Sequence, residues 1–354
     1  MKIEKIVDTI VRNYCDTNRR NRTLFLVGPS GVGKSDCVRQ AAQQLGATFG
    51  TSFPVLDLRL SQMEPPDFCG VPSVREGRTV KNPPEWLPAD PDSRGFILLD
   101  EITSAPPVMQ AAAYQVALDR CMGDTPIPAG WMVIAAGNRA SDRGVNYPLA
   151  APLLARMTLL NVESSLDGFV DYCAKRNVRP EVIAFVKSRG EYLNERDETV
   201  NAKIGDLPVG KPFATQRGWT TAAQYYLDEP AAERLELLRG CVGDRAAIDL
   251  EAFLRIWQSM PNIDRIFSAP DSAPLPKNAA TRYAVSMGVS FRCNKQNLAM
   301  AKRYLDRLPM EFKALAIKLA YMRDSTVAEC EAFAKFADEN PELWNGLSPT
   351  VSQP

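Results

Sequence analysis

Eight consecutive residues, Gly28 to Ser35, have the types and the spacing that bind phosphate. They read Gly28-Pro29-Ser30-Gly31-Val32-Gly33-Lys34-Ser35 and fit the pattern G-x-x-x-x-G-K-[ST]. In such a loop the glycines let backbone N–H groups turn toward a β-phosphate, the lysine amine reaches the β- and γ-phosphate oxygens, and the hydroxyl binds Mg²⁺. We therefore predict that all eight residues bind a nucleoside triphosphate and that Ser35 is a metal ligand.

The segments on either side of this loop have the patterns that the motif requires. Residues 23–27 are a short apolar run, which predicts a buried strand. Residues 34–45 predict a helix that begins at Lys34, because apolar side chains recur there at helical spacing: Cys37, Val38, Ala41, Ala42 and Leu45. The helix N-terminus would add partial positive charge to the phosphate site.

Two acidic residues, Asp100 and Glu101, end a second apolar run. Residues 95–99 predict a strand that is buried on both faces, with the two carboxylates at the carboxyl edge of a parallel sheet. There we expect Asp100 to hold Mg²⁺ through its water shell and Glu101 to polarise the attacking water. A base for water favours hydrolysis over phosphoryl transfer to a small acceptor. The alternative, a core strand that ends in Asp-Glu by coincidence, is disfavoured by the loop at Gly28.

A third apolar run, Trp131–Ala136, leads into Gly137 and Asn138. An asparagine at the end of this strand can hydrogen-bond the γ-phosphate or the lytic water. Taken alone, an asparagine here is more often a turn residue. Its role therefore depends on whether its strand lies beside the one that leads into the phosphate-binding loop.

The amino-acid composition limits the kinds of binding partner and the cellular compartment that we expect. The 354 residues carry 42 basic and 42 acidic side chains, so no global charge favours nucleic acid or an anionic membrane. No run of about 18 apolar residues and no signal-peptide pattern is present, which favours a cytoplasmic protein. The eight cysteines include no C-x-x-C pair, and the chain has no histidine, so a zinc site and histidine-based catalysis are both excluded.

Five segments occur in an order that resembles the AAA+ ATPases of the MoxR type. The resemblance covers about residues 21–226 and implies a Walker A motif, a Walker B motif, sensor 1, an arginine finger and sensor 2, in that order. The segments are Gly28–Ser35, Asp100-Glu101, Asn138, residues 148–157 (PLAAPLLARM) and residues 213–219 (FATQRGW). The resemblance implies ATP and Mg²⁺ as ligands, a hexameric homo-oligomeric ring, and a protein client that often contains a von Willebrand A domain.

Two arginines receive catalytic roles from this resemblance. Arg156 corresponds to the arginine finger, which would act on a neighbouring protomer, and Arg217 corresponds to sensor 2. The nearby Arg139 and Arg143 are competing candidates for the finger. Ala155 stands where the family commonly has an acid, and Gln216 where it usually has proline, but both arginines are present.

The same resemblance, with the alternation of apolar runs, predicts three domains. Residues 1–163 form an AAA+ α/β domain, whose five-stranded parallel sheet is flanked by helices and whose insert spans about residues 60–88, with a hairpin tip near Gly77 that would face a client. Residues 164–260 form an α-helical lid, and residues 261–354 form an α-helical C-terminal extension after a Pro-rich linker. The expected strands are Thr23–Val27, Val55–Leu58, Phe96–Leu99, Trp131–Ala136 and Met157–Val162, and the expected helices include Lys34–Leu45, Pro107–Arg120, Ala279–Met287, Asn297–Leu308 and Met310–Met322.

Three functions are compatible with the phosphate-binding loop. The first is a ring-forming ATPase that remodels or activates a protein partner in the manner of a chaperone. The second is an AAA+ motor or loader that acts on nucleic acid, for which we find neither a basic stripe nor an added DNA-binding module. The third is a small-metabolite kinase, which should lack a base such as Glu101. A GTPase is disfavoured because the Asn-Lys-x-Asp tetrad is absent.

Overall fold

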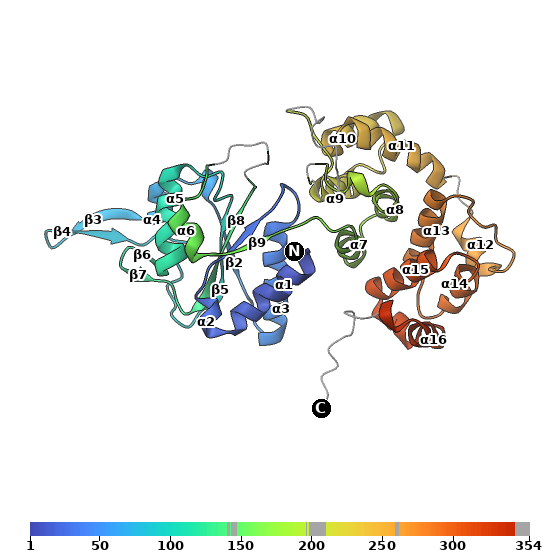
Figure 1. The fold of residues 1–354 in the computed structure, drawn as a ribbon, viewed down its shortest axis with the longest axis horizontal. Coiled ribbons are helices and arrows are strands. Elements are labelled where there is room, and N and C mark those ends of the chain that lie inside the picture. Colours follow the sequence, from blue (N-terminus) through green and yellow to red (C-terminus); the bar gives the residue numbers. More distant parts are fainter. Residues whose placement is uncertain (140–141, 143–146, 196, 198–209, 259–261, 344–354) are drawn as a thin grey trace. The chain divides into compact units, whose positions relative to one another are not determined.

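The computed structural model describes residues 1–139, 142, 147–195, 197, 210–258 and 262–343. The chain divides into two compact units, one formed by residues 1–165 and 196–199 and the other by residues 166–195 and 200–354 (Figure 1). The three domains with boundaries after residues 163 and 260 stay a prediction. Within the described residues, no helix has the length and the apolar character that crossing a membrane requires.

The first unit contains the predicted five-stranded parallel sheet. The strands lie in the order β2-β5-β8-β1-β9, and all four neighbouring pairs are parallel. The strand that leads into the phosphate-binding loop, β1, therefore lies between two strands that come more than 100 residues later. The strands are β1 (Leu24–Val27), β2 (Val55–Arg59), β5 (Arg94–Asp100), β8 (Gly130–Gly137) and β9 (Thr158–Asn161).

Helices cover both faces of this sheet, because its strands bury alternate side chains in two separate cores. On one face, Phe96 and Leu98 pack with residues of α1 (Ile3–Cys15) and α3 (Lys34–Phe49). On the other face, Ile97 and Leu99 pack with residues of α4 (Pro65–Cys69), α5 (Pro107–Tyr114) and α6 (Ala151–Arg156). Burial on both faces explains why these strands are continuous apolar runs. A short helix, α2 (Thr17–Arg20), and a 3₁₀ turn, η1 (Leu60–Gln62), complete the helical elements before α4.

Two small hairpins extend the first unit. The strands β3 (Val71–Arg75) and β4 (Arg78–Asn82) form an antiparallel ribbon that stands away from the rest of this unit (Figure 1). Its turn residues Glu76 and Gly77 both have positive φ, as a two-residue hairpin turn requires. The predicted hairpin tip near Gly77 is therefore present. The second hairpin joins β6 (Cys121–Met122) to β7 (Thr125–Pro126).

The helix predicted from Pro107 to Arg120 is α-helical over only part of that range. After Tyr114 the chain continues as a π-helical turn, η2 (Gln115–Asp119), and ends at Arg120, which has a left-handed φ of 52°. The Thr23 hydroxyl donates a hydrogen bond of 2.6 Å to the Ala117 carbonyl, so the residue directly before β1 contacts this turn. The apolar spacing alone does not reveal such a change of helical type.

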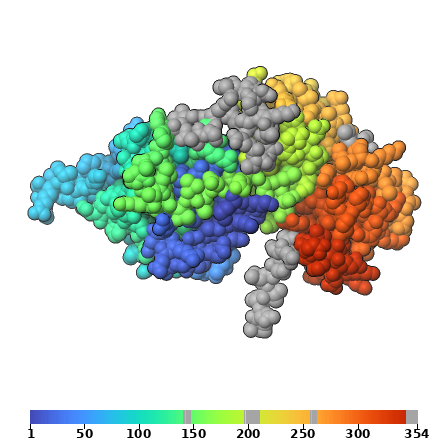
Figure 2. Space-filling model, in the orientation of Figure 1, coloured from blue at the N-terminus to red at the C-terminus, as the bar shows by residue number. Residues whose placement is uncertain are grey.

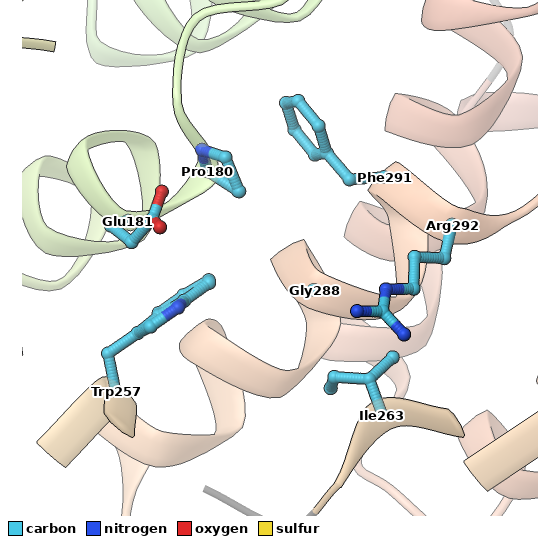
Figure 3. Close-up of a pocket in the computed structure, with 7 residues that line it drawn as sticks. All are labelled: Pro180, Glu181, Trp257, Ile263, Gly288, Phe291 and Arg292. Atoms are coloured by element: carbon cyan, nitrogen blue, oxygen red, sulfur yellow. The ribbon is translucent and has the colours of Figure 1, made fainter. Parts of the chain in front are cut away.

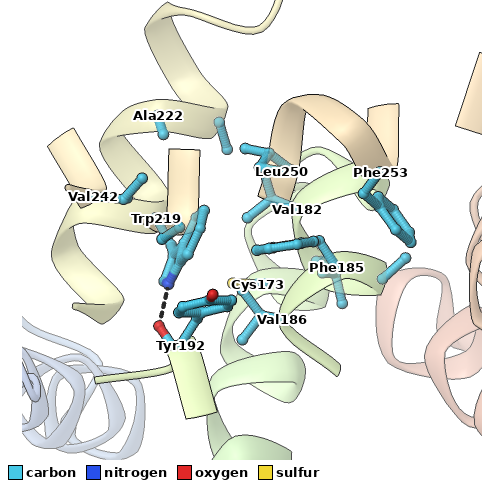
Figure 4. Packing of buried hydrophobic residues seen from close by; sticks show 14 of the residues in the cluster. Cys173, Val182, Phe185, Val186, Tyr192, Trp219, Ala222, Val242, Leu250 and Phe253 are labelled. Atoms are coloured by element: carbon cyan, nitrogen blue, oxygen red, sulfur yellow. Dashed lines mark hydrogen bonds between the residues drawn. The ribbon is translucent and has the colours of Figure 1, made fainter. Parts of the chain in front are cut away.

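The second unit is helical, and one of its cores surrounds Trp219. The Trp219 ring is fully buried, and its Nε1 donates a hydrogen bond of 2.7 Å to the Tyr192 carbonyl (Figure 4). The core draws side chains from α7 (Leu166–Lys175), α8 (Pro180–Ser188), η3 (Gly190–Tyr192), α9 (Gln216–Tyr225), α10 (Ala231–Val242) and α11 (Asp244–Gln258). Because the indole N–H has a partner, the large ring is buried without an unpaired donor.

A further core of the second unit lies among its later helices. Its largest fully buried side chains are Tyr304, Phe312 and Phe336. The elements of this region are α12 (Ile263–Ser268), α13 (Ala279–Arg292), α14 (Leu298–Leu305), α15 (Met310–Arg323), η5 (Ser325–Glu329), α16 (Glu331–Glu339) and η6 (Pro341–Leu343). The two cores are linked, since α13 and α15 contribute Met287 and Leu319 to the core around Trp219.

Candidate functional site

The phosphate-binding loop follows β1 and ends at the N-terminus of α3, as predicted. Gly33 is the N-cap of α3 and has a φ of 102°, a conformation that glycine adopts without strain. It contributes no side-chain cap to the first turn of the helix, and a helix N-terminus favours the binding of an anion. Gly28 is required for a different reason, because a Cβ there would lie 2.6 Å from the Val162 carbonyl oxygen. The loop thus lies directly against the end of β9.

Lys34 and Asn138, which are 104 positions apart, meet inside this loop. The Lys34 Nζ donates hydrogen bonds to the carbonyls of Gly28 and Pro29, at 2.8 and 3.1 Å, and to the Asn138 Oδ1 at 2.9 Å. Only 9% of Lys34 is exposed, so its charge lies in the loop and not on the surface. This position suits an amine that binds phosphate oxygens, and Asn138 lies beside it.

Ser35 and Asp100 also come together at this edge of the sheet. The Ser35 Oγ donates a hydrogen bond of 2.6 Å to the Asp100 Oδ2. A hydroxyl and a carboxylate are the oxygen ligands that Mg²⁺ prefers, and Mg²⁺ sites on phosphates commonly use only one or two protein ligands with waters. The pair therefore fits a magnesium site that is completed by phosphate and water. Within the described residues no cluster of three His, Cys, Asp or Glu side chains suits a metal held by protein alone.

Glu101 lies beside Asp100 in a strained backbone conformation. Its φ is 56°, which costs a residue with a Cβ of the order of 1 kcal/mol or more. Its N–H donates a hydrogen bond of 2.9 Å to the Asp100 Oδ1, and its exposed carboxylate accepts a hydrogen bond from the Ser61 hydroxyl. The turn thus separates the two carboxylates: Asp100 points to Ser35, and Glu101 points to Ser61.

Thr103 holds Asn138 in place, and the sequence analysis did not identify it. Its Oγ1 accepts a hydrogen bond of 2.9 Å from the Asn138 N–H, and only 7% of this threonine is exposed. Gly137 lets the two segments approach, since a Cβ there would lie 2.6 Å from the Thr103 methyl carbon. The only signal in the sequence is that Thr103 follows Asp100 by three positions, which is too common a spacing to single it out.

Arg139, one of the competing finger candidates, is engaged within its own unit. Its Nη1 lies 3.5 Å from the Oδ1 of Asp197, a carboxylate with no exposed surface, and its Nη2 donates to the Val162 carbonyl. Asp197 also accepts a hydrogen bond of 3.0 Å from the Ser164 N–H. Arg139 therefore ties Asp197 to the end of β9. The other competitor, Arg143, lies outside the described residues.

Arg156 occupies the opposite end of the strands from the phosphate-binding loop. It is the last residue of α6, two positions before β9, whose first residue, Thr158, lies opposite Leu24. The loop begins at the other end of the same pairing, after Val27, which lies opposite Asn161. Four residues of strand span about 13 Å. Arg156 is exposed, and its side chain has no hydrogen bond or ion pair with a described residue.

Arg217 lies in the second unit, in the first turn of α9. Thr215 is the N-cap of this helix and its hydroxyl accepts a hydrogen bond of 3.0 Å from the Gly218 N–H. Arg217 is exposed, and its side chain has no ion pair with any residue that the structure describes. A cation near a helix N-terminus is opposed by the helix dipole. Arg217 therefore does not stabilise α9 through the helix dipole. Its role as sensor 2 stays a prediction.

A cavity of about 260 Å³ lies in the second unit, and its lining differs from that of the phosphate-binding loop (Figure 3). Its charged lining residues are already paired: Glu181 with Arg179 at 3.1 Å, and Arg292 with Asp264. The remaining lining is apolar or aromatic, namely Pro180, Trp257, Ile263, Gly288 and Phe291. Because its charges are neutralised, this cavity does not suit a triphosphate.

Comparison with known families is consistent with this geometry. Residues 23–157 match the model of the AAA domain of the dynein-related subfamily. The match spans the phosphate-binding loop, Asp100, Glu101, Asn138 and Arg156. The matched residues all lie in the first unit and make up about two fifths of the chain. No curated protein sequence matches the chain.

Several solved structures resemble the chain weakly. NtrX from Brucella abortus, solved in complex with ADP, is 13% identical over 96% of this chain and 68% of its own, with a TM-score of 0.35. A candidate ATPase from Cytophaga hutchinsonii is 12% identical over 96% and 88%, with a TM-score of 0.37. Hsp104, solved with ATPγS and casein, is 17% identical over 71% and 42%, with a TM-score of 0.35. All three TM-scores are below 0.5, so these likenesses carry no argument.

Proposed function

We propose that this protein is a MoxR-like AAA+ motor that hydrolyses ATP and uses the energy to remodel or activate a protein partner. The observation that carries the proposal is the meeting of Lys34 with Asn138 and of Ser35 with Asp100 at one edge of the sheet, at 2.9 and 2.6 Å. Four side chains with separate roles toward a triphosphate thus converge there from the start of α3, the end of β5 and the residue that follows β8. The AAA domain match over the same residues supports this reading.

Each residue has a distinct part in the proposed reaction. The Lys34 amine would exchange its bonds to loop carbonyls for bonds to the β- and γ-phosphate oxygens, while the N–H groups at the start of α3 surround the β-phosphate. Glu101 would orient the attacking water and accept its proton, because its carboxylate is exposed and lies next to Asp100. Asn138 would hydrogen-bond the γ-phosphate or that water.

Ser35 and Asp100 would hold Mg²⁺ in this reaction. The ion, when bound, neutralises charge that develops on the phosphate oxygens. The Ser35 hydroxyl would leave the Asp100 carboxylate and become a direct ligand, and Asp100 would act through bound water. Both residues already lie within a hydrogen-bond length of each other, so neither element has to move far.

Arg156 would complete the site of a neighbouring protomer. It lies at the far end of the strands from its own loop, and it is exposed without a described partner. Arg139 is the weaker candidate because it is paired with the buried Asp197. On this basis we propose a homo-oligomeric ring, which the MoxR resemblance suggests is hexameric, with Arg217 as the residue of the helical lid that responds to the γ-phosphate.

The proposed client is a protein, in line with the MoxR resemblance, and a von Willebrand A domain is the first candidate. The β3–β4 hairpin is the proposed contact, because it is exposed and belongs to the insert. Nucleic acid is the alternative client.

Phosphate release from ATP is the test of the catalytic part. The wild-type protein should release phosphate only with Mg²⁺, and Ser35→Ala should reduce the rate strongly without unfolding the chain. Stimulation of this rate by a von Willebrand A protein, but not by DNA or RNA, would support the client. Stimulation by nucleic acid alone would favour the alternative motor. No hydrolysis under any of these conditions would exclude an ATPase.

A further inference from the structure

The β3–β4 hairpin carries three cations that no described residue neutralises. Arg75, Arg78 and Lys81 are all exposed, and none forms an ion pair with a residue that the structure describes. The Arg75 Nη2 donates a hydrogen bond of 3.1 Å to the neutral Asn82 Oδ1. The one acidic side chain of the hairpin, Glu76, lies in the turn. The hairpin therefore has a net positive charge of about two on a chain whose total charge is zero.

The register of the hairpin places two of these cations opposite each other. Arg75 and Arg78 form the last pair of the ribbon, directly before the turn. Like charges in directly opposed positions destabilise a two-stranded sheet. An isolated ribbon of two strands is itself only marginally stable in water. This arrangement is therefore unfavourable in the free hairpin and would be relieved by an anion that binds between the two guanidinium groups.

Apolar side chains accompany the cations on both faces. Val71, Val74 and Val80 are 58%, 75% and 38% exposed. The register places Val71 and Val80 on the same face as the two arginines, and Val74 on the opposite face with Lys81. The space-filling view shows the hairpin standing out from the first unit (Figure 2). Exposed β-branched side chains beside unpaired charges are typical of a surface that binds another chain.

We propose that this hairpin binds an extended acidic polypeptide segment that also carries apolar side chains. Aspartate or glutamate side chains of the segment would pair with Arg75, Arg78 and Lys81, and its apolar side chains would cover the exposed valines. This inference rests on the proposed function, because it assigns a chemical class to the client of the remodelling motor. It deepens that function by predicting which part of a client the motor recognises.

Two features favour a polypeptide over a nucleic acid. Residues 71–82 contain no aromatic side chain, whereas surfaces for single strands use aromatic rings on which bases stack. Three exposed valines would meet sugar and phosphate on a nucleic acid, where they gain little, but they can pack against side chains of a peptide.

The test is direct binding of peptides to the full-length protein. A fluorescein-labelled peptide of about ten residues, built of alternating Glu and Val, matches the length and charge of the ribbon. The comparison probes are the same peptide with Lys in place of Glu and a single-stranded DNA of similar length. Fluorescence anisotropy should show binding of the Glu-Val peptide only, weakening between about 50 and 200 mM salt.

Variants then locate the binding surface. The triple variant R75Q/R78Q/K81Q should bind the acidic peptide about tenfold more weakly or worse, since three ion pairs are lost. The single change R78E should also weaken binding, and it leaves the fold intact because Arg78 has no described partner. The matched control R265Q/K277Q/K335Q removes the same charge from exposed positions of the second unit and should bind as the wild type does.

Each outcome decides for or against the inference. Equal binding by the triple variant and the wild type, or equal binding of the Lys peptide, overturns it. Hairpin-dependent binding of the DNA overturns it in favour of nucleic acid, and loss of self-association in R78E without loss of peptide binding assigns the hairpin to a second copy of the chain. Phosphate release, measured in parallel, separates the two proposals: hydrolysis without peptide binding overturns only this inference, and peptide binding without hydrolysis overturns only the ATPase.

Discussion

The hydroxyl of Ser61 donates a hydrogen bond to the carboxylate of Glu101, across 40 positions of sequence. Ser61 lies in the 3₁₀ turn η1, between β2 and the helix α4 that leads to the β3–β4 hairpin. This bond fixes the Glu101 carboxylate, and the left-handed φ of Glu101 sets the direction in which its side chain leaves the backbone. The proposed catalytic base is therefore in contact with the segment that leads to the proposed client-binding hairpin.

Removing this hydrogen bond should change the basal rate of hydrolysis. A carboxylate that accepts a hydrogen bond is less free to turn and to accept a proton from water, so Ser61→Ala should raise basal phosphate release by about fivefold, equivalent to about 1 kcal/mol. Ser61→Thr keeps the hydroxyl and should behave as the wild type. A lower rate in Ser61→Ala would show that Ser61 holds Glu101 in its productive position.

Lys34 and Glu101 should be separable by substitution. Lys34→Ala removes the buried amine from the loop and should abolish ATP binding, whereas Glu101→Gln should keep ATP bound and stop its turnover. Binding of a fluorescent ATP analogue and phosphate release, measured on both variants, test this. Wild-type turnover in Glu101→Gln would remove this residue from the mechanism.

Activity should depend on contact between protomers. If Arg156 acts on a neighbour, turnover per chain should rise with protein concentration, and Arg156→Ala should be nearly inactive, because such arginines contribute about 10³ or more in rate. Mixing Arg156→Ala with Lys34→Ala should restore part of the activity, since each variant supplies what the other lacks. Flat specific activity on dilution, with a monomer in light scattering at saturating ATP, would contradict the ring.

Arg139 and Arg156 should differ in their effect on stability. Arg139→Ala removes a partner from the fully buried Asp197, so the free energy of unfolding should fall by about 3 kcal/mol. Arg156→Ala changes an exposed side chain and should shift it by less than about 0.5 kcal/mol. Urea unfolding monitored by circular dichroism measures both. A stable Arg139→Ala without activity would instead favour Arg139 as the finger.

Thiol labelling should report on the helix that begins at the phosphate-binding loop. Burial, with a contribution from the charge of Asp36, raises the pKa of Cys37 to about 12, and its Sγ donates to the Lys34 carbonyl at 2.8 Å. At about pH 8 iodoacetamide should therefore label the exposed Cys15 but not Cys37 until denaturant is added. Mass spectrometry of digested protein locates the label. Equal labelling of both residues in the native protein would show that the start of α3 opens readily.

The sequence predicts the strand, loop and helix around Lys34 because phosphate binding restricts residue types at fixed positions. It also predicts that Asp100 and Asn138 end buried strands. It does not predict that Asn138 contacts Lys34, because that contact depends on strand order: β8 lies directly beside β1 although it comes much later in the chain. Helix ends were predicted less well, as the π-helical turn after Tyr114 illustrates.

The supporting residues of the site were not predicted from sequence. Ser61, Thr103 and Asp197 act through hydrogen bonds or ion pairs with residues 33 to 58 positions away. Serine, threonine and aspartate are common in turns for local reasons, so their presence there gives no signal of a distant partner. Only the strand order β2-β5-β8-β1-β9, which brings their partners near, identifies their roles.

The phosphate-binding loop is synthesised early but can take its final shape only late. Gly28 donates a hydrogen bond to the Gly137 carbonyl at 3.3 Å and lies against Val162, so the loop rests between the ends of β8 and β9. A nascent chain that stops before residue 130 lacks both Gly137 and Val162. Contacts between residues so far apart in sequence also form slowly. Ribosome-bound chains truncated before β8 should therefore fail to retain ATP, and those that extend well past residue 165 should retain it. Nucleotide binding would then mark the moment at which the first unit has folded during translation.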